Sequence, residues 1–156
     1  MNTILLRALK GEYTHSFIGK LDELGCKIVF TYHIPYTYMS YKKYLPDNCV
    51  LADYYDMVRG VLDENLQERK IYPSSEILDQ MQKCLGTLFP MMERINYYRK
   101  RNSRIYEAYF QYIIYWLTII QEHKVEAVFF SAIPHEGITF VLYNLAKILN
   151  IKVIIF

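Results

Sequence analysis

Cysteine is scarce in this sequence, and its spacing supports none of the folds that depend on it. The three cysteines, Cys26, Cys49 and Cys84, are odd in number and form no CxxC pair. Neither a disulfide framework nor a zinc knuckle is therefore expected. Free thiols in this number are typical of a reducing compartment, and we expect a cytoplasmic protein.

Long apolar runs are also missing. The most hydrophobic long stretch, residues 109–120, contains Gln111 and Thr118 and is much shorter than the roughly 20 residues that cross a bilayer. We therefore expect no membrane-spanning segment. The first nine residues carry Arg7 inside their apolar stretch and lack a small-residue cleavage site, so they do not resemble a signal peptide.

Neither sign of charge dominates. The chain has 18 Lys and Arg, 16 Asp and Glu, and a hydrophobic content of 53%. This composition argues against disorder and against nucleic acid as a partner. Its 156 residues fit one domain, residues 1–156, or a portion of a larger protein. What the sequence has in excess is aromatic: 16 Tyr and 8 Phe, and tyrosine suits half-buried surfaces, ligand grooves and interfaces.

The two ends of the chain each predict a strand, a helix and a second strand. Apolar periodicity and turn residues mark these units, with Gly25 and Asn150 as the helix stops. The expected order is strand 3–9, polar loop 10–15, helix 16–24 and strand 27–32, then strand 125–130, loop 131–137, helix 138–149 and strand 152–156. Two such units predict an α/β, Rossmann-like parallel sheet with helices on both faces.

The middle section, about residues 52–124, is expected to be largely helical. Ser74 or Ser75 can cap a helix there, Pro90 is expected to end it, and a polar lapse at Asn102 and Ser103 predicts a break in the helix that follows. The expected elements are a helical turn at 38–44, a short strand at 49–51, and helices at 52–67, 76–89 and 91–124.

The sequence ends in a hydrophobic strand, residues 153–156. Domains more often end in a helix, a turn or a polar tail. We therefore expect this strand to lie inside a sheet, and the chain to be the N-terminal portion of a two-domain protein.

Ligands of open parallel sheets gather at the carboxyl ends of the strands. Three expected loops meet at that edge, residues 10–15, 33–38 and 131–137, and they contain His15, His33 and His135. This placement predicts a shared crevice.

The loop at 131–137 is the most informative of the three. Pro134 restricts Ile133 to an extended backbone, and Gly137 frees the backbone before the helix, so His135 and Glu136 should lie at the positive end of that helix. An imidazole there can act as a base or a hydrogen-bond donor. The alternative is that His135 only caps the helix.

Other motifs of catalysis are missing. The first loop contains Lys10 and Gly11, which can contact a ligand or form a solvated turn, but it matches neither GxGxxG nor GxxxxGK[ST]. The chain has no HExxH and no GxSxG, and we expect Asp53 and Asp56 to be solvated rather than to bind a metal. No metal and no cofactor are expected in this segment.

The stretch 94–104 combines basic and aromatic side chains, among them Arg99, Lys100, Arg101 and Arg104. Such a stretch can contact anionic lipid headgroups, which predicts a peripheral membrane surface. The alternative is the solvated face of a helix junction.

The segment Phe129 to Gly137, FFSAIPHEG, together with Val141 to Lys152, VLYNLAKILNIK, resembles the N-terminal half of bacterial surface-polysaccharide biosynthesis glycosyltransferases of the GT-B type, which act in capsule and lipopolysaccharide synthesis. The resemblance covers about 30 residues, and the helical middle carries no motif. It implies a cytoplasmic domain, near the inner membrane, that binds an acceptor glycan or lipid-linked acceptor. It also implies a missing C-terminal domain that binds the nucleotide-sugar donor.

In that family the base for the acceptor hydroxyl faces the cleft between the halves. The resemblance thus makes His135 and Glu136 the catalytic candidates. The substrate-binding candidates are Lys10, Gly11, His15, His33, Ser131 and Gly137.

Two other functions remain open. The chain can be a non-enzymatic αβα domain that docks on a partner through its tyrosine-rich surface or its last strand. It can also be another Rossmann-like enzyme, which the missing phosphate fingerprint disfavours.

Overall fold

The structure is a computed structural model that describes residues 1–6, 13–33, 42–61, 66, 68–95, 98 and 102–156. The elements in chain order are β1 (Asn2–Leu6), α1 (Tyr13–Glu23), β2 (Lys27–His33), the 3-10 turn η2 (Lys42–Tyr44), β3 (Val50–Asp53), α3 (Tyr54–Arg59), α5 (Ser75–Gln82), α6 (Leu85–Glu93), α7 (Asn102–Glu122), β4 (Ala127–Phe130), α8 (Gly137–Ile148) and β5 (Lys152–Ile155).

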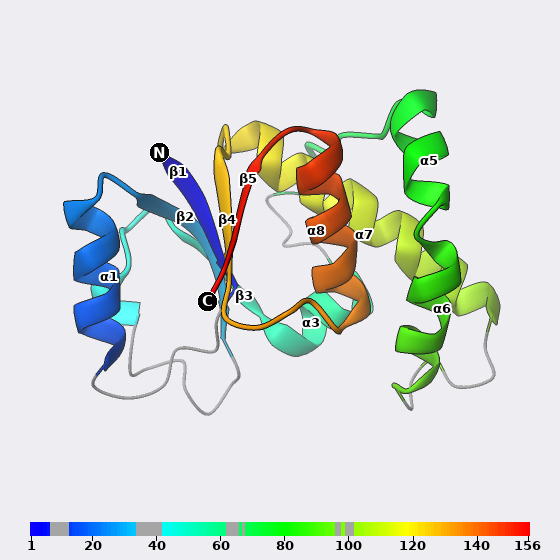
Figure 1. Cartoon of the computed structure of the whole chain (residues 1–156), viewed down its shortest axis with the longest axis horizontal. Coiled ribbons are helices and arrows are strands. Elements are labelled where there is room, and N and C mark those ends of the chain that lie inside the picture. Colours follow the sequence, from blue (N-terminus) through cyan, green and yellow to red (C-terminus); the bar gives the residue numbers. More distant parts are fainter. Residues whose placement is uncertain (7–12, 34–41, 62–65, 67, 96–97, 99–101) are drawn as a thin grey trace.

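The expected α/β fold is confirmed. Five strands form one parallel sheet in the order β3-β2-β1-β4-β5. From β1 the chain winds outward through β2 to β3, and it returns to the other side of β1 to add β4 and β5 (Figure 1). The order therefore reverses between β1 and β4, and this is the switch point of a doubly wound, Rossmann-like sheet.

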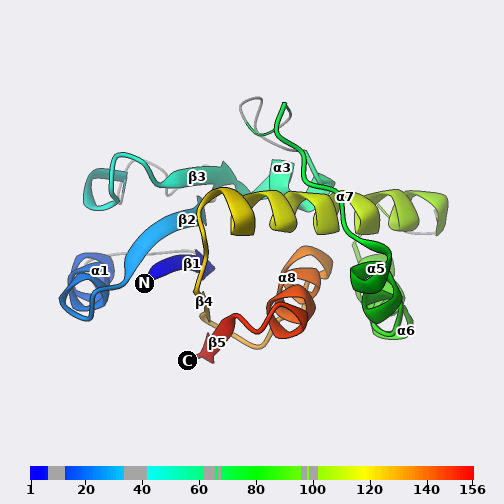
Figure 2. The same cartoon turned by 90° about the horizontal axis from the view of Figure 1, so that it is seen from above.

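Helices cover both faces of the sheet, as expected. Alternate strand residues point to opposite faces: Ile4 and Phe30 face α7 and α8, whereas Leu5 and Ile28 face α1. Figure 2 shows α1 on one side of the strands and α7 with α8 on the other. α5 and α6 pack on the side of α8 that is turned away from the sheet (Figure 1).

The left-handed residues predicted at two helix ends are confirmed. Gly25 has φ 70° after α1, and Asn150 has φ 55° after α8. Two further expectations also hold, because Ser74 caps α5 by accepting from the Ile77 N–H, and α7 begins at Asn102, where the polar lapse predicted a break.

The start of one helix and the end of another differ from the expectation. α1 begins at Tyr13 rather than at Ser16, and neither glycine nor proline interrupts the residues it gains. The helix expected over 52–67 ends at Arg59, because Gly60 is left-handed with φ 71°. There a Cβ would lie 2.9 Å from the Cβ of Gln111, so only glycine lets this turn approach α7.

The helix expected over 76–89 is in fact two helices, and Pro90 does not end the second. The break falls at Lys83 and Cys84, and α6 continues through Pro90. Pro90 has no N–H to donate to the Gly86 carbonyl, which costs one helical hydrogen bond. Burial of Leu88 and Met92 on the same helix compensates for that loss.

The last strand does not lie inside the sheet that the structure describes. β5 pairs with β4 along one side only and forms an edge of the five strands. The expectation of an interior strand rested on its apolar residues, but Val153 and Ile154 are only half-buried, and Ile155 is exposed.

Candidate functional site

The carboxyl ends of the strands form the lower edge of the sheet in Figure 1. β1 and β4 end side by side, with Leu6 paired to Phe130. The loop 131–136 leaves β4 at this switch point, and α3 begins directly after β3 at the same edge. This is the position at which doubly wound sheets bind their ligands.

Hydrogen bonds within the loop hold its shape. Pro134 is buried, whereas His135 is exposed, and the His135 Nδ1 lies 2.9 Å from the carbonyl oxygen of Ile133. A carbonyl oxygen only accepts, so Nδ1 carries the proton of a neutral ring and Nε2 is the basic nitrogen. The backbone of Glu136 is extended, and its carbonyl oxygen accepts from the Phe140 N–H at 2.8 Å and the Thr139 hydroxyl at 2.9 Å.

The side chain of Glu136 does not cap α8 although it stands at the cap position. Its Oε1 instead accepts a 2.6 Å hydrogen bond from the Tyr54 hydroxyl of α3. Burial, and then this bond and the negative charge of Glu136, raise the pKa of Tyr54 above its ordinary value. Tyr54 therefore stays protonated and acts as the hydrogen-bond donor to Glu136 Oε1. The second carboxylate oxygen, Glu136 Oε2, remains as an acceptor at the loop.

Tyr54 is placed by a short helix that is fixed at both ends. Asp53 caps α3 by accepting from the N–H groups of Tyr55, at 2.7 Å, and Asp56, at 3.3 Å. Near the other end, the Val58 carbonyl oxygen accepts hydrogen bonds from the hydroxyls of Tyr98 and Tyr112. Asp53 thus has a structural role as a helix cap, which the prediction of a solvated carboxylate did not include.

Tyr54 was missed by the sequence analysis altogether. It lies 82 residues from Glu136, and only the pairing of β3 with β2 brings α3 to this edge. Its ring packs against Tyr32 of β2, with centroids 5.6 Å apart. The excess of tyrosine was the one signal in the sequence that pointed toward such a cluster.

The structure brings only part of the predicted site together. Ser131, His135 and Glu136 line one hollow, which also contacts Tyr32 and Thr139. The hollow measures about 80 Å³, which is space for two or three water molecules. Its lining comes from β2, β4, the loop after β4 and the start of α8. Residues 10–12 and 34–38 of the other two predicted loops lie outside the described residues, so the crevice shared by three loops stays a prediction.

His15 and His33 belong to a helix and a strand rather than to the loops in which they were predicted. His15 belongs to α1 and not to a loop, because the helix begins two residues before it. His33 is the last residue of β2, paired with Asp53, and not the first residue of a loop. Lys10 and Gly11 lie outside the described residues.

Gly137 has a structural role different from the one inferred from the sequence. Its φ is not positive, so backbone freedom is not what the position requires. A Cβ on Gly137 would lie 2.7 Å from Cγ of Met92, so the glycine allows α8 to begin against α6. Trp116 fixes the same turn from the other side, by donating its indole N–H to the Ile138 carbonyl at 2.8 Å.

The basic stretch is described only in part. Arg104 is an exposed residue in the first turn of α7, whereas Arg99, Lys100 and Arg101 lie outside the described residues.

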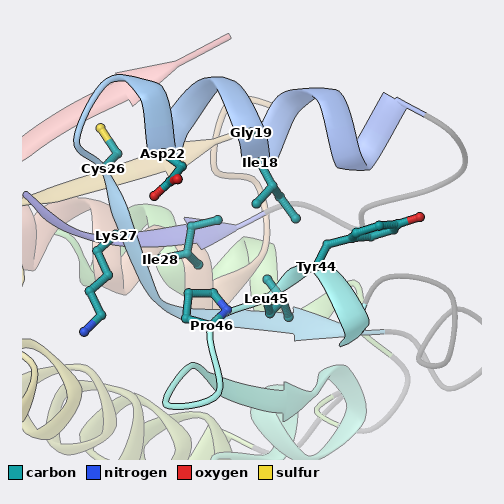
Figure 3. A pocket seen from close by; sticks show the side chains of 9 residues that line it. All are labelled: Ile18, Gly19, Asp22, Cys26, Lys27, Ile28, Tyr44, Leu45 and Pro46. Atoms are coloured by element: carbon teal, nitrogen blue, oxygen red, sulfur yellow. The ribbon is translucent and has the colours of Figure 1, made fainter.

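A second cavity lies on the α1 face, away from the carboxyl edge (Figure 3). It measures about 440 Å³ and lies between α1 and residues 44–46, over Ile28 of β2. Asp22 and Lys27 are the charged residues that line it. No motif in the sequence pointed to it.

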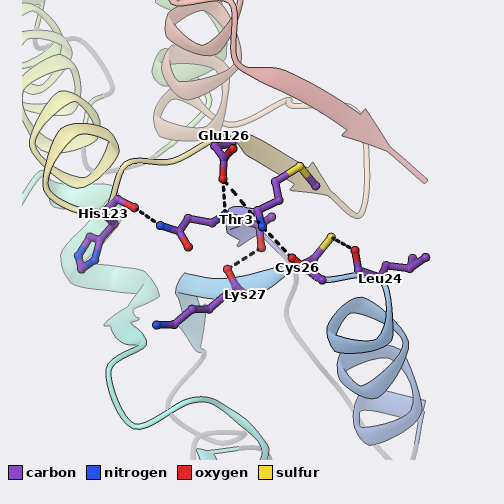
Figure 4. A network of polar contacts seen from close by, with 9 residues as sticks. Thr3, Leu24, Cys26, Lys27, His123 and Glu126 are labelled. Carbon is purple, nitrogen blue, oxygen red and sulfur yellow. Dashed lines mark hydrogen bonds and ion pairs between the residues drawn. The ribbon is translucent and has the colours of Figure 1, made fainter.

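The amino edge of the sheet is a structural network (Figure 4). Thr3 donates to the Lys27 carbonyl at 3.1 Å, and the Asn2 side chain donates to the His123 carbonyl at 2.8 Å. Glu126 Oε2 accepts from the Asn2 backbone N–H at 3.0 Å. Burial lowers the pKa of His123, and nothing in this network leads to the loop 131–136.

Among the described residues, no three His, Cys, Asp or Glu side chains are grouped so that they could hold a metal ion. No helix in the described part of the chain has the length and apolarity to cross a membrane.

Comparison with known proteins adds no identity to this geometry. No protein-family model, no curated protein and no solved structure matches the chain.

Proposed function

We propose that the chain is the acceptor-side domain of a glycosyltransferase that builds cell-surface polysaccharide. The observation that supports this most is that an exposed imidazole, His135, and a carboxylate held by Tyr54, Glu136, lie on one loop at the switch point of a doubly wound sheet. Ligands of such sheets bind at this position. In this proposal the domain works in the cytoplasm beside the inner membrane, with a lipid-linked or free acceptor glycan as its substrate.

The chemistry asked of the site is removal of one proton. A nucleotide-sugar is held by a further domain. The bond between its anomeric carbon and the phosphate oxygen breaks, the nucleoside diphosphate leaves, and the anomeric carbon bonds to an acceptor hydroxyl oxygen. The hydroxyl proton passes to His135 Nε2, which the contact of Nδ1 with Ile133 leaves as the basic nitrogen. Glu136 Oε2 accepts a hydrogen bond from a second hydroxyl group of the acceptor glycan. Tyr54 fixes the carboxylate by donating a hydrogen bond to Oε1.

The test is binding of glycans by the chain itself, which needs no donor. We expect an immobilised glycan panel to retain the wild-type chain. Glu136→Gln and His135→Ala are each expected to weaken that retention about tenfold, because the first removes the negative charge and one acceptor oxygen and the second removes the imidazole.

The matched control for the glycan panel is Glu68→Gln, an exposed carboxylate outside the site. It should bind like the wild type. If no glycan is retained, or if all three variants bind equally, the acceptor-side function is wrong.

A second candidate function is docking through the edge of the sheet, with a second copy of the chain as the partner. β5 has one unpaired edge in the described sheet, and Ile155 and Phe156 are 44% and 48% exposed beside it. Lys152 carries the only charge of the strand, so little protects the edge from pairing with another strand. Two such edges can pair antiparallel about a twofold axis.

This candidate predicts a dimer in analytical ultracentrifugation. Ile155→Lys adds a charge to the exposed edge and should shift the population to monomer, since edge lysines oppose strand pairing. Lys20→Gln, at a side chain of α1 that is 69% exposed and does not belong to the β5 edge, serves as the control. A wild-type chain that sediments as a monomer at every concentration would dismiss docking of this kind.

A further inference from the structure

A groove runs between the end of α3 and the first half of α7. Its volume is about 480 Å³, within the range of small-ligand sites. The lining residues are Arg59, Tyr98, Arg104, Glu107, Ala108 and Gln111, and we call this feature the arginine groove.

The spacing of residues on α7 builds one wall. Arg104, Glu107, Ala108 and Gln111 are separated by three or four residues and so share one face of the helix. Ala108 is buried and small, which leaves the space between the longer side chains open. Three polar side chains on this face therefore surround an apolar floor.

Gly60 brings the opposite wall into place. Its missing side chain allows the end of α3 to approach Gln111 of α7, where a Cβ would lie only 2.9 Å from the Gln111 Cβ. Arg59 immediately precedes it and lines the groove from this side. The hydroxyl of Tyr98 is bonded to the Val58 carbonyl at 2.8 Å, which holds the same turn of α3 at the base of the groove.

The charges of the groove favour an anion. Its lining includes two guanidinium groups, those of Arg59 and Arg104, and one carboxylate, that of Glu107. Arg59 makes no ion pair with any residue that the structure describes, whereas Arg69, at the other end of α7, is paired with Glu122 at 3.2 Å. The first turn of α7 carries Arg104, and the positive end of a helix adds to the attraction.

We propose that the arginine groove binds the phosphate group of a hydroxyl-bearing phosphate ester. A guanidinium group matches two phosphate oxygens with two parallel N–H donors, and Gln111 adds an amide donor from the same wall. Glu107 accepts only, so it suits a hydroxyl of the ester and opposes a bare anion. Sugar phosphates and phosphatidylglycerol headgroups both carry this chemistry.

This site is independent of the proposed glycosyl transfer. Its residues lie at the end of α3 and on α7, whereas the site at the loop 131–136 uses the beginning of α3 and the loop after β4. Binding of a phosphate ester here requires neither His135 nor Glu136.

The experiment titrates the whole chain with glucose 6-phosphate and with inorganic phosphate, followed by heteronuclear NMR. We expect amide shifts near Arg59 and Arg104, with the ester bound more tightly than inorganic phosphate. Arg59→Gln and Arg104→Gln should each weaken binding of the ester about tenfold, the loss of one charge-assisted contact. Both side chains are exposed, so both variants should keep the wild-type circular dichroism spectrum.

Arg69→Gln is the matched control, because it removes an arginine paired at the far end of α7. Co-sedimentation with phosphatidylcholine vesicles, with and without phosphatidylglycerol, distinguishes the two sources. If the chain binds phosphatidylglycerol vesicles and the arginine variants do not, the ligand is a lipid headgroup. If the chain binds glucose 6-phosphate but not these vesicles, the ligand is a soluble ester. The proposal is overturned if neither ester source binds, or if Arg59→Gln and Arg104→Gln bind as Arg69→Gln does.

Discussion

Trp116→Ala is expected to lower the free energy of unfolding by about 3 to 5 kcal/mol, the range for removing a large buried aromatic side chain. Trp116 is fully buried in the middle of α7, between the sheet and α8. Its ring meets Phe30 of β2 edge to face at a centroid distance of 5.2 Å, and Tyr115 at 4.9 Å. Replacement by alanine removes these contacts and leaves a cavity that the rigid elements around it cannot fill.

The same side chain also links the core to the candidate site. The indole N–H donates to the Ile138 carbonyl in the first turn of α8, two residues after Glu136. Loss of this bond frees the start of α8 and with it the loop that carries His135. We therefore expect Trp116→Ala to loosen the loop 131–136 as well as to destabilise the fold.

Trp116→Phe separates these two effects, because it keeps most of the apolar ring and removes only the N–H donor. We expect a loss of about 1 to 2 kcal/mol, the cost of a buried hydrogen bond and a small cavity. Since Trp116 is the only tryptophan, urea unfolding should be followed by circular dichroism. If alanine and phenylalanine give the same loss, packing around the ring is not what stabilises this region.

The sequence predicted the parts of the fold that depend on local periodicity. Both βαβ units were identified because their strands are short runs of apolar, β-branched and aromatic residues and their helices have apolar residues every three or four positions. The end of α3 was missed, because the requirement for glycine at residue 60 comes from the approach of Gln111 in a distant helix. Pro90 was misjudged for a similar reason, since burial of Leu88 and Met92 sustains α6 across it.

The site was predictable only as a location. The rule that ligands bind at the carboxyl ends of strands pointed to His135 and Glu136, and the structure places both at the switch point. The bond from Tyr54 to Glu136 joins residues 82 positions apart, and no spacing in the sequence signals it. Contacts of this kind follow from strand order, which the sequence did not define.

Raising the pH above about 10 is expected to destabilise the protein steeply, because buried tyrosines must stay neutral in the folded state. Burial is the largest cause of a raised pKa at Tyr54, Tyr109 and Tyr112, each above an ordinary value of 10.0. The pKa of Tyr112 is raised further by the neighbouring hydroxyl of Tyr98, through repulsion and a hydrogen bond, and by the charges of Tyr54 and Glu136. Burial likewise raises the pKa of the Cys49 thiol from 9.0 to about 12.

The sign follows from proton binding. Above pH 10 the unfolded chain releases the three phenolic protons, whereas the folded chain keeps them, so the folded state binds more protons. Stability is then fully present below pH 10 and falls as pH rises, until the folded pKa values are reached. Each tyrosine contributes a slope of about 1.4 kcal/mol per pH unit, and the three together about 4 kcal/mol per unit.

Tyr112→Phe tests this account, because it removes one titrating group and leaves Tyr98 bonded to the Val58 carbonyl. We expect the slope of unfolding free energy, from urea titrations between about pH 9.5 and 11 under reducing conditions, to become less steep by up to about 1.4 kcal/mol per pH unit, the contribution of one phenol. Tyr72→Phe, at a side chain 70% exposed, should leave the slope as it is in the wild type, since that phenol meets water before and after unfolding. A slope unchanged by Tyr112→Phe would mean that the Tyr112 hydroxyl, which contacts the Tyr98 hydroxyl and the Val58 carbonyl, is already open to solvent in the folded protein. The description of α3 as a helix fixed from α7 would then be wrong.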